Sequence, residues 1–389
     1  MIDKKQKKRK EKKEKRRKEK KEKHDRTINN KKIFVLVTLL PFAFEMIDYI
    51  VAIFIFCIVL FLYLHIQFHL KTSNDLEMYE IEQGSKEKLE EICDIRQPVL
   101  FDFVNAAIMQ SSNKQYLLST YRSFELKVRN IKDDVEQIET EMYMPLPLHA
   151  AMKLLVEDKG GSYISENNTE FLKETGIMKQ LQYNDEFLRP YMVSNCNYDI
   201  LMGSLNAFTP FRYEINYRNY FCVTQGSAQI KMAPPQSTKY VHPVYDYENF
   251  EFRSPINPWD PQPCYAIDFD KIKCLEFTLT PGKTVFIPAF WWYSIKFGED
   301  TSISCFRYRT YMNNVAISPY IAMYALQLQN VKRNTVKKVS IEELNMNHLH
   351  SKPLTPLTPL TLETNNNTAP DVMLPTEQHA QLNELKQQQ

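Results

Sequence analysis

Two strand-like segments of this sequence carry side chains that could perform charge chemistry. The first, TPFRYE, places Arg212 and Glu214 two residues apart. Alternate residues of a strand point to the same face, so Glu214 could pair with Arg212, or with Arg218 further along the chain. The second segment, CFRYRT, places Arg307 and Arg309 on one strand face. Two neighbouring guanidinium groups could hold an anion, although such pairs are more often exposed or matched to carboxylates.

The histidines and cysteines offer little to a metal ion. Between residues 71 and 330 the only histidines are His149 and His242, and neither belongs to an H-x-D/E pattern. The seven cysteines lack C-x-x-C spacing. This pattern favours buried thiols over a zinc site, although a secreted protein could still pair a few of them. Nucleophile-elbow, P-loop and dinucleotide-binding motifs are absent too, so hydrolases and nucleotide-dependent enzymes have no support.

The order of motifs resembles the cupin-like family of JmjC type. EICDIRQPV at 91–99 is similar to its opening motif, TPFRYE at 209–214 to its T-P-L-H-x-D strand, and PGKTVFIP with WWY at 281–293 to its PGD-x-LFIP and WWH block. The resemblance covers about residues 85–312. It implies an all-β core with flanking helices, a double-stranded β-helix or jelly roll. Characterised members of the family are hydroxylases or demethylases that use iron(II) and 2-oxoglutarate.

At the positions that the resemblance assigns to the iron, this chain has other residues. Arg212 replaces the first histidine, Glu214 stands at the acid position and Tyr293 replaces the distal histidine. An arginine is always charged and cannot ligate iron. The family lysine that commonly binds 2-oxoglutarate falls on Ala228. We therefore expect a non-catalytic domain without metal or cofactor, in which a salt bridge has replaced the iron.

Two alternatives to this interpretation are an active oxygenase with unorthodox ligands, which would use iron and 2-oxoglutarate, and a reused pocket in which Arg212 binds an anion. For Arg212 itself, the alternative is a side chain that points to solvent at the mouth of the fold. Further pocket candidates are Asn219, Trp292, Arg307 and Arg309. For Trp292, packing in the core is favoured over pocket lining.

A long apolar run precedes these motifs. Residues 49–66 contain no formally charged side chain. A helix with a rise of about 1.5 Å per residue would extend about 27 Å over this run, close to the thickness of the hydrocarbon core of a bilayer. We expect a single span at about 47–66, with a hairpin of two segments within 33–66 as the alternative.

The charge distribution orients that span. Residues 1–32 hold 18 basic and 6 acidic residues, whereas residues 33–389 hold 31 basic and 41 acidic residues. Basic residues beside a span stay on the cytoplasmic side, which predicts a cytoplasmic N-terminus. The basic tail could also contact anionic lipid headgroups. The acidic body makes nucleic acid a poor partner for it, so the expected partners are the bilayer and an unidentified protein.

Composition divides the chain into four parts. These are a basic tail at 1–32, expected to be disordered or cytoplasmic, a membrane segment at 33–70, a cupin-like domain at 71–335 and a low-complexity, disordered tail at 336–389. Membrane-anchored cupin-like proteins also resemble products of large DNA viruses, which makes a virion membrane one alternative location. The sequence does not fix an organelle.

Local patterns predict the elements that must position the site. Helical spacing occurs at 76–92, 148–157, 169–182 and 317–333, and strand patterns occur at 98–104, 115–130 and throughout 206–311. Only 8 glycines occur, and Gly203, Gly226 and Gly282 fall at sharp points of the β region, where we expect positive φ or close approach of the backbone. Asn167 begins a glycosylation triplet that matters if the body is lumenal.

Overall fold

The computed structural model describes residues 46–82, 84–132 and 143–333, together with single positions between 21 and 31. The predictions for most of the basic tail, for the apolar piece at 33–44 and for the C-terminal tail therefore lie outside the described residues.

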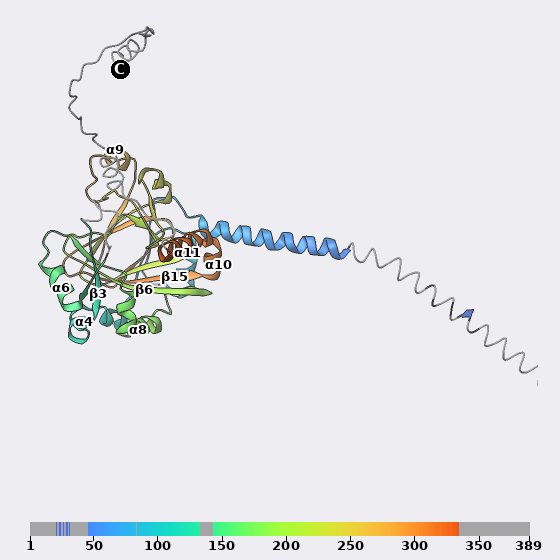
Figure 1. Ribbon diagram of the computed structural model, residues 1–389, viewed down its shortest axis with the longest axis horizontal. Coiled ribbons are helices and arrows are strands. Elements are labelled where there is room, and N and C mark those ends of the chain that lie inside the picture. Colours follow the sequence, from blue (N-terminus) through green and yellow to red (C-terminus); the bar gives the residue numbers. More distant parts are fainter. Residues whose placement is uncertain are drawn as a thin grey trace, which may run out of the picture. The chain divides into compact units, whose positions relative to one another are not determined.

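Two β-sheets form the core of the domain (Figure 1). The first sheet has nine strands in the order β1-β2-β13-β8-β15-β6-β5-β3-β4, and the second has six in the order β10-β11-β7-β14-β9-β12. The first contains β1 (Tyr79–Ile81), β2 (Val99–Asp102), β3 (Glu125–Asn130), β4 (Met144–Pro147), β5 (Tyr163–Ser165), β6 (Val193–Gly203), β8 (Arg218–Gln225), β13 (Lys283–Phe286) and β15 (Ser302–Thr310). The second contains β7 (Arg212–Tyr213), β9 (Ala228–Ala233), β10 (Val244–Asp246), β11 (Glu251–Arg253), β12 (Leu275–Leu279) and β14 (Trp292–Phe297). The prediction of a mostly β core with flanking helices is confirmed.

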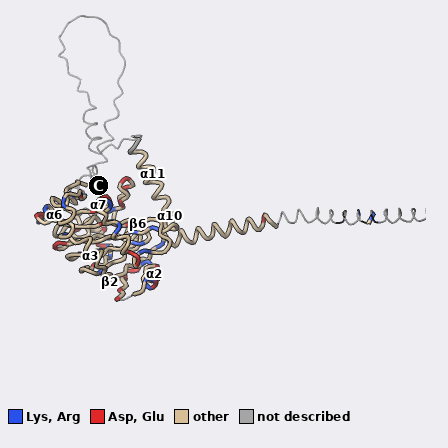
Figure 2. The backbone as a smooth tube through the Cα atoms, turned by 90° about the horizontal axis from the view of Figure 1, so that it is seen from below, with Lys and Arg blue, Asp and Glu red and all other residues tan. Residues whose placement is uncertain are grey.

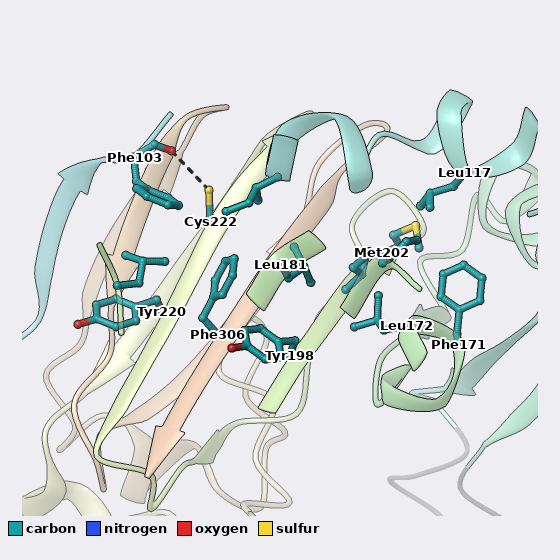
Figure 3. Packing of buried hydrophobic residues seen from close by; sticks show 14 of the residues in the cluster. Phe103, Leu117, Phe171, Leu172, Leu181, Tyr198, Met202, Tyr220, Cys222 and Phe306 are labelled. Atoms are coloured by element: carbon teal, nitrogen blue, oxygen red, sulfur yellow. Dashed lines mark hydrogen bonds between the residues drawn. The ribbon is translucent and has the colours of Figure 1, made fainter. Parts of the chain in front are cut away.

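Helices pack on the outer face of the nine-stranded sheet. The helices of the domain are α2 (Lys86–Asp94), α3 (Ala106–Ser111), α4 (Lys114–Thr120), α6 (Leu148–Glu157), α7 (Thr169–Glu174), α8 (Ile177–Asn184), α9 (Ala266–Phe269), α10 (Tyr311–Ala316) and α11 (Ser318–Arg333), with the 3-10 helix η1 at Pro235–Tyr240. Apolar residues of α2, α3, α4, α6, α7 and α8 share one buried cluster with β6, β8 and β15. Figure 3 shows part of this cluster, in which Leu181 of α8 lies beside Tyr198 of β6 and Phe306 of β15.

The alternation of side chains along the strands separates the layers. On β8, Tyr220 belongs to the cluster under the helices, whereas Phe221 belongs to a second cluster between the two sheets. On β15, Phe306 and Cys305 divide in the same way. Successive side chains of a strand point to opposite faces, so the nine-stranded sheet is buried on both sides. The interior between the sheets is the place where inward-facing polar residues can meet.

Several local predictions are confirmed and others are wrong. Helix α6 occupies the predicted 148–157, and α11 begins one residue after the predicted 317. The helix predicted at 76–92 is wrong in its first half, because β1 pairs there with β2 and α2 begins only after Ser85, whose side chain accepts a hydrogen bond from the Lys88 amide at 3.3 Å. Such a side-chain cap favours the start of a helix.

Two further segments differ from the prediction. The strand pattern at 115–130 hides helix α4, which begins after Asn113, and only its second half forms β3. The helix predicted at 169–182 is divided into α7 and α8 at Gly176, which has a φ of +75°. Glycine adopts this left-handed conformation readily, and it ends helices for that reason.

The three sharp points assigned to glycine are confirmed. Gly226 and Gly282 have φ values of +70° and +87°. Gly203 has no such φ, but a Cβ added to it would overlap the ring of Phe297. The β region thus uses its rare glycines where a side chain would not fit.

Among the described residues, one helix, Met46–Leu70, is long and apolar enough to cross a membrane by length and composition. It has 25 residues, its most apolar window has a mean hydropathy of 2.7, and none of that window is buried in the protein. Asp48 is its only formally charged residue, so the tube in Figure 2 is almost entirely tan along this helix, without the blue and red that mark charged residues. The helix contains the whole of the predicted span at 47–66.

Candidate functional site

The interior between the two sheets changes from apolar to polar along β15. Ile303 and Cys305 face this interior as part of its apolar cluster. Arg307 and Arg309 follow at the next two positions with the same side-chain direction, because they lie two and four residues beyond Cys305. The strand therefore delivers two cations to the polar end of an interior that is otherwise apolar.

The neighbouring strand β6 supplies amides and a carboxylate to the same end. In the antiparallel pairing of β15 with β6, Arg307 lies opposite Asn197 and Arg309 lies opposite Asn195. Directly opposed residues share a face, so both asparagines are next to the cations. Asp199, two residues further along β6, lies with its Oδ2 3.7 Å from Arg307 Nη1.

The three positions that the resemblance assigns to the metal lie together. Arg212 of β7 is directly opposite Tyr293 of β14, and its guanidinium carbon is 5.9 Å from the centroid of the tyrosine ring. The Tyr293 hydroxyl donates to Glu214 Oε1 at 3.2 Å. Arg212 is only 5% exposed, so the alternative of a solvent-facing side chain is wrong.

Arg212 belongs to a buried network of four charges. Its Nη2 is 2.5 Å from Glu166 Oε2, and its Nη1 is 3.1 Å from Glu251 Oε1. Arg129 contacts the same two carboxylates through Nη1, at 3.0 Å to Glu166 and 3.1 Å to Glu251. Tyr143 donates to Glu166 at 3.2 Å. Two arginines and two glutamates thus alternate, and their formal charges cancel.

These contacts correct the predicted partners. Glu214 pairs neither with Arg212 nor with Arg218. Glu214 Oε1 lies 3.3 Å from Arg307 Nε, and its Oε2 accepts from the Asn216 amide at 3.1 Å. Arg218 instead pairs with Asp94, on the helix-covered side of the sheet. Strand alternation correctly placed Glu214 at the site, but it could not show which arginine would contact this carboxylate.

The electrostatics of the network follow from its burial. Burial alone would raise the pKa of Glu166, but the guanidinium groups of Arg212 and Arg129 lower this pKa from 4.5 to about 2. Burial and the nearby Glu214 raise the pKa of Tyr293. At physiological pH Glu166 is therefore ionised and keeps its ion pairs with Arg212 and Arg129. Tyr293 is neutral, so its hydroxyl can donate a hydrogen bond.

The donor set at the metal positions does not fit an iron ion. A guanidinium has only N–H donors and no lone pair for a metal. The carboxylate of Glu214 is engaged by Arg307, Asn216 and Tyr293. Within the described ranges, no group of three His, Cys, Asp or Glu side chains is arranged to hold a metal ion. The facial triad of two histidines and a carboxylate therefore has no counterpart here.

A cavity of about 360 Å³ opens beside the network. Its lining combines amides, guanidinium groups, carboxylates and a wall of mostly aromatic residues. The lining residues are Asn167, Asn195, Asn197, Arg212, Tyr213, Glu214, Asn216, Asn249, Phe250, Glu251, Phe252, Arg307, Arg309, Ile321 and Tyr324. Of the predicted site residues, Arg212, Glu214, Arg307 and Arg309 are among them.

Four other predicted positions lie outside this lining. Tyr293 is behind it, in contact with Glu214. Trp292 points to the opposite face of β14, where it packs with Phe211 and Tyr213. Ala228 lies at the far end of the sheet interior, paired with Phe297 and Leu279. Asn219 is fully buried and donates to the Ile287 carbonyl at 3.1 Å. Packing thus explains Trp292, as the sequence favoured.

Arg129, Glu166 and Glu251 are not among the site residues predicted from the sequence. The only signal would have been a charge inside an apolar strand pattern, as in LKVRN around Arg129. Arg129 is 37 residues from Glu166 and 122 residues from Glu251 in the chain, so spacing alone could not join them. The asparagines of the cavity gave no signal, because isolated asparagines are usually found in turns.

Fold and site together define a class: a two-sheet cupin-like domain in which ion pairs fill the metal positions. A family model described as a cupin-like domain matches residues 85–313, more than half of the chain. The chain belongs to the cupin-like domain family, which confirms the resemblance found in its motifs. That family includes 2-oxoglutarate oxygenases.

Similarity to individual curated proteins is more limited. The chain is 29% identical over 104 residues to HSPB1-associated protein 1 of Rattus norvegicus, which is 26% of this chain and 22% of that protein. The protein of the same name from Homo sapiens is also 29% identical over 104 residues, covering 26% of this chain and 21% of that protein. The match thus spans about a fifth of the length of these relatives.

Proposed function

We propose that this protein is a membrane-anchored, non-catalytic binding module of the cupin-like family, with a jelly-roll domain that uses neither iron nor 2-oxoglutarate. One observation carries the proposal. Arg212, at the position of the first iron ligand, contacts both Glu166 and Glu251. Breaking a buried ion pair by removing one partner typically costs about 3–5 kcal/mol. An ion that displaced this guanidinium would have to offset a similar cost.

The experiment is a metal titration of the purified full-length protein in detergent. Iron(II) under anaerobic conditions and manganese(II) are added, and bound metal is counted after gel filtration. A cupin-like oxygenase with intact ligands, assayed in parallel, serves as the positive control. We expect no stoichiometric metal and no succinate release from 2-oxoglutarate. Tight binding of one metal ion per chain, or turnover of 2-oxoglutarate, would establish the oxygenase with unorthodox ligands instead.

The apolar helix Met46–Leu70 supports the proposed anchor. At about 1.5 Å per residue its 25 residues extend about 37 Å, longer than the hydrocarbon core of about 30 Å. The proposed topology places the basic N-terminus in the cytoplasm, near anionic headgroups, and the domain on the other side, where an unidentified protein partner would meet it. A virion membrane is an alternative location.

Protease protection in sealed vesicles tests this topology. We expect a tag at residue 1 to be digested and the cupin-like domain to be protected. Digestion of both would indicate the hairpin arrangement, in which the domain returns to the cytoplasm.

A further inference from the structure

One cation of the cavity has no carboxylate partner. Arg212 and Arg307 each lie within 4.0 Å of carboxylate oxygens. Within the described part of the chain, no Asp or Glu oxygen lies within that distance of Arg309. Arg309 is half-buried, and burial lowers its pKa. The more distant Glu214 favours the charged form of Arg309 only in part, so a bound anion would offset the remaining cost of desolvating this charge.

Two contacts hold the guanidinium of Arg309: a hydrogen bond at one edge and an aromatic ring against one face. Its Nε donates to Asn216 Oδ1 at 2.6 Å, and its guanidinium carbon is 5.2 Å from the centroid of the Phe250 ring. Asn216 is itself fixed by its own donation to Glu214. These contacts leave the two terminal nitrogens without a hydrogen-bond partner among the described residues. Such a fork matches the two oxygens of a carboxylate or phosphate.

Apart from the ion-paired Arg212, Glu214, Glu251 and Arg307, the polar lining of the cavity consists mainly of side-chain amides. Asn195 lies opposite Arg309 and Asn197 lies opposite Arg307 in the strand pairing, and both side chains are exposed. A carboxamide both donates and accepts, so it can bind hydroxyl or amide groups without adding charge. The volume of about 360 Å³ lies at the lower end of the range of about 300–1,000 Å³ for small-molecule sites. These features favour a small polar ligand with one anionic end.

We propose that this cavity binds a small organic anion, whose carboxylate or phosphate contacts the terminal nitrogens of Arg309 and whose hydroxyl- or amide-bearing body contacts Asn195 and Asn197. The inference rests on the proposed function, because it assigns anion recognition to an arginine of β15 rather than to a metal. It differs from the alternative in which Arg212 binds the anion, since Arg212 already contacts Glu166 and Glu251. It also narrows the anion site considered for the Arg307 and Arg309 pair to Arg309, because Arg307 already contacts Asp199 and Glu214.

The test is calorimetric titration of the metal-free, full-length protein in detergent with three probes: inorganic phosphate, citrate and glucuronate. We expect saturable binding of at least one probe. Arg309→Gln should weaken it about tenfold or more, the usual effect of losing a charge-assisted hydrogen bond. Asn195→Asp should weaken it similarly, because a carboxylate opposite Arg309 competes with the ligand. Arg122→Gln, at an exposed arginine outside the cavity, is the matched control and should bind as the wild type.

The outcomes separate this inference from the proposed function. Failure of all three probes to bind, or equal binding by the wild type, Arg309→Gln and Asn195→Asp, overturns the inference and leaves the non-catalytic interpretation intact. A parallel titration with manganese(II) tests the proposed function, which holds that the domain uses no metal. Anion binding that requires manganese, with one ion taken up per chain, overturns both.

Discussion

Tyr293 lies directly opposite Arg212 across the pairing of β14 with β7, with the guanidinium 5.9 Å from the phenol ring. The sequence motifs of the family have a histidine at both of these positions. Instead, each residue has its own acidic partner: Arg212 contacts Glu166, and Tyr293 donates to Glu214. Fixed side chains thus occupy and neutralise both positions, which is a structural reason why these positions do not fit a metal ion.

The stability of the network should depend on Arg212. Arg212→Met removes the cation shared by Glu166 and Glu251 and leaves Arg129 as their nearest counter-charge. Removing one partner of a buried ion pair typically costs about 3–5 kcal/mol. We expect a loss of that size in the free energy of unfolding, measured by urea denaturation in detergent.

The matched control for this change is Arg122→Met, at an exposed arginine. Surface substitutions of this kind usually change stability by about 0.5 kcal/mol or less. Equal stability of the two variants would mean that the buried network contributes no net stability, and that Arg212 is tolerated rather than required.

The Tyr293 hydroxyl should make a smaller contribution. Tyr293→Phe removes one hydrogen bond to Glu214, and the expected loss in the free energy of unfolding is about 0.5–1.5 kcal/mol. Tyr183→Phe, at a tyrosine that is 85% exposed, is the control and should be neutral. A loss well above this range would show that the hydroxyl also holds Arg307 in place through Glu214.

Acid should destabilise the buried network of two arginines and two glutamates by protonating Glu166. Its pKa is about 2 in the folded protein, compared with the ordinary value of 4.5 for a glutamate, which applies to the unfolded chain. The unfolded chain therefore binds the proton first as pH falls, so the stabilisation is complete above about pH 4.5 and is lost progressively towards pH 2. Urea denaturation between pH 5.5 and pH 3 should show falling stability in the wild type.

Glu166→Gln is the control for that pH dependence. The variant lacks the titrating group, so its stability should be lower at neutral pH but should change less between pH 5.5 and pH 3. Parallel pH profiles for the two proteins would assign the acid sensitivity to other carboxylates.

The sequence predicted those parts of the structure that depend on local pattern. Helix α6 and the glycine positions follow from spacing and backbone conformation, which neighbouring residues determine. The start of α4 was missed because YLLSTY reads equally well as a strand, and only the cap at Asn113 decides between the two. Alternation along β15 placed Arg307 and Arg309 correctly on one face.

The partners in the site were beyond such reasoning. Glu251 and Arg129 are 122 residues apart, and they meet because β3 and β11 lie in different sheets that face one interior. A single sequence identifies a charge at an inward position but not the charge that neutralises it. The same limit explains why alternation predicts Arg212 or Arg218, rather than Arg307, as the partner of Glu214.

The apolar helix should fail to insert when several charges are placed near its centre. An arginine there costs about 2.5–3.5 kcal/mol on insertion scales, whereas each Leu, Ile, Phe or Val contributes only about −0.3 to −0.6 kcal/mol. The triple variant Ile53→Arg, Phe56→Arg, Leu60→Arg should therefore shift the protein from the membrane pellet to the alkaline carbonate supernatant. Asp48→Arg, near the end of the helix Met46–Leu70, is the control and should remain in the pellet. If both variants stay in the pellet, the membrane attachment lies elsewhere in the chain.

Two glycines with similar φ values should respond differently to a methyl group. Gly226 and Gly176 have φ values of +70° and +75°. A Cβ at Gly226 would lie 2.5 Å from the Glu299 carbonyl oxygen and 2.7 Å from Thr301 Cα, whereas nothing lies within 4 Å of a Cβ at Gly176.

Gly176→Ala adds only left-handed strain, about 1–2 kcal/mol. Gly226→Ala adds a clash with backbone that a rotamer change cannot relieve, so its loss in the free energy of unfolding should exceed that of Gly176→Ala. Urea denaturation of the two variants measures the difference directly. Equal losses would mean that the turn after β8 yields to the methyl group, and that the glycine is needed there for its φ alone.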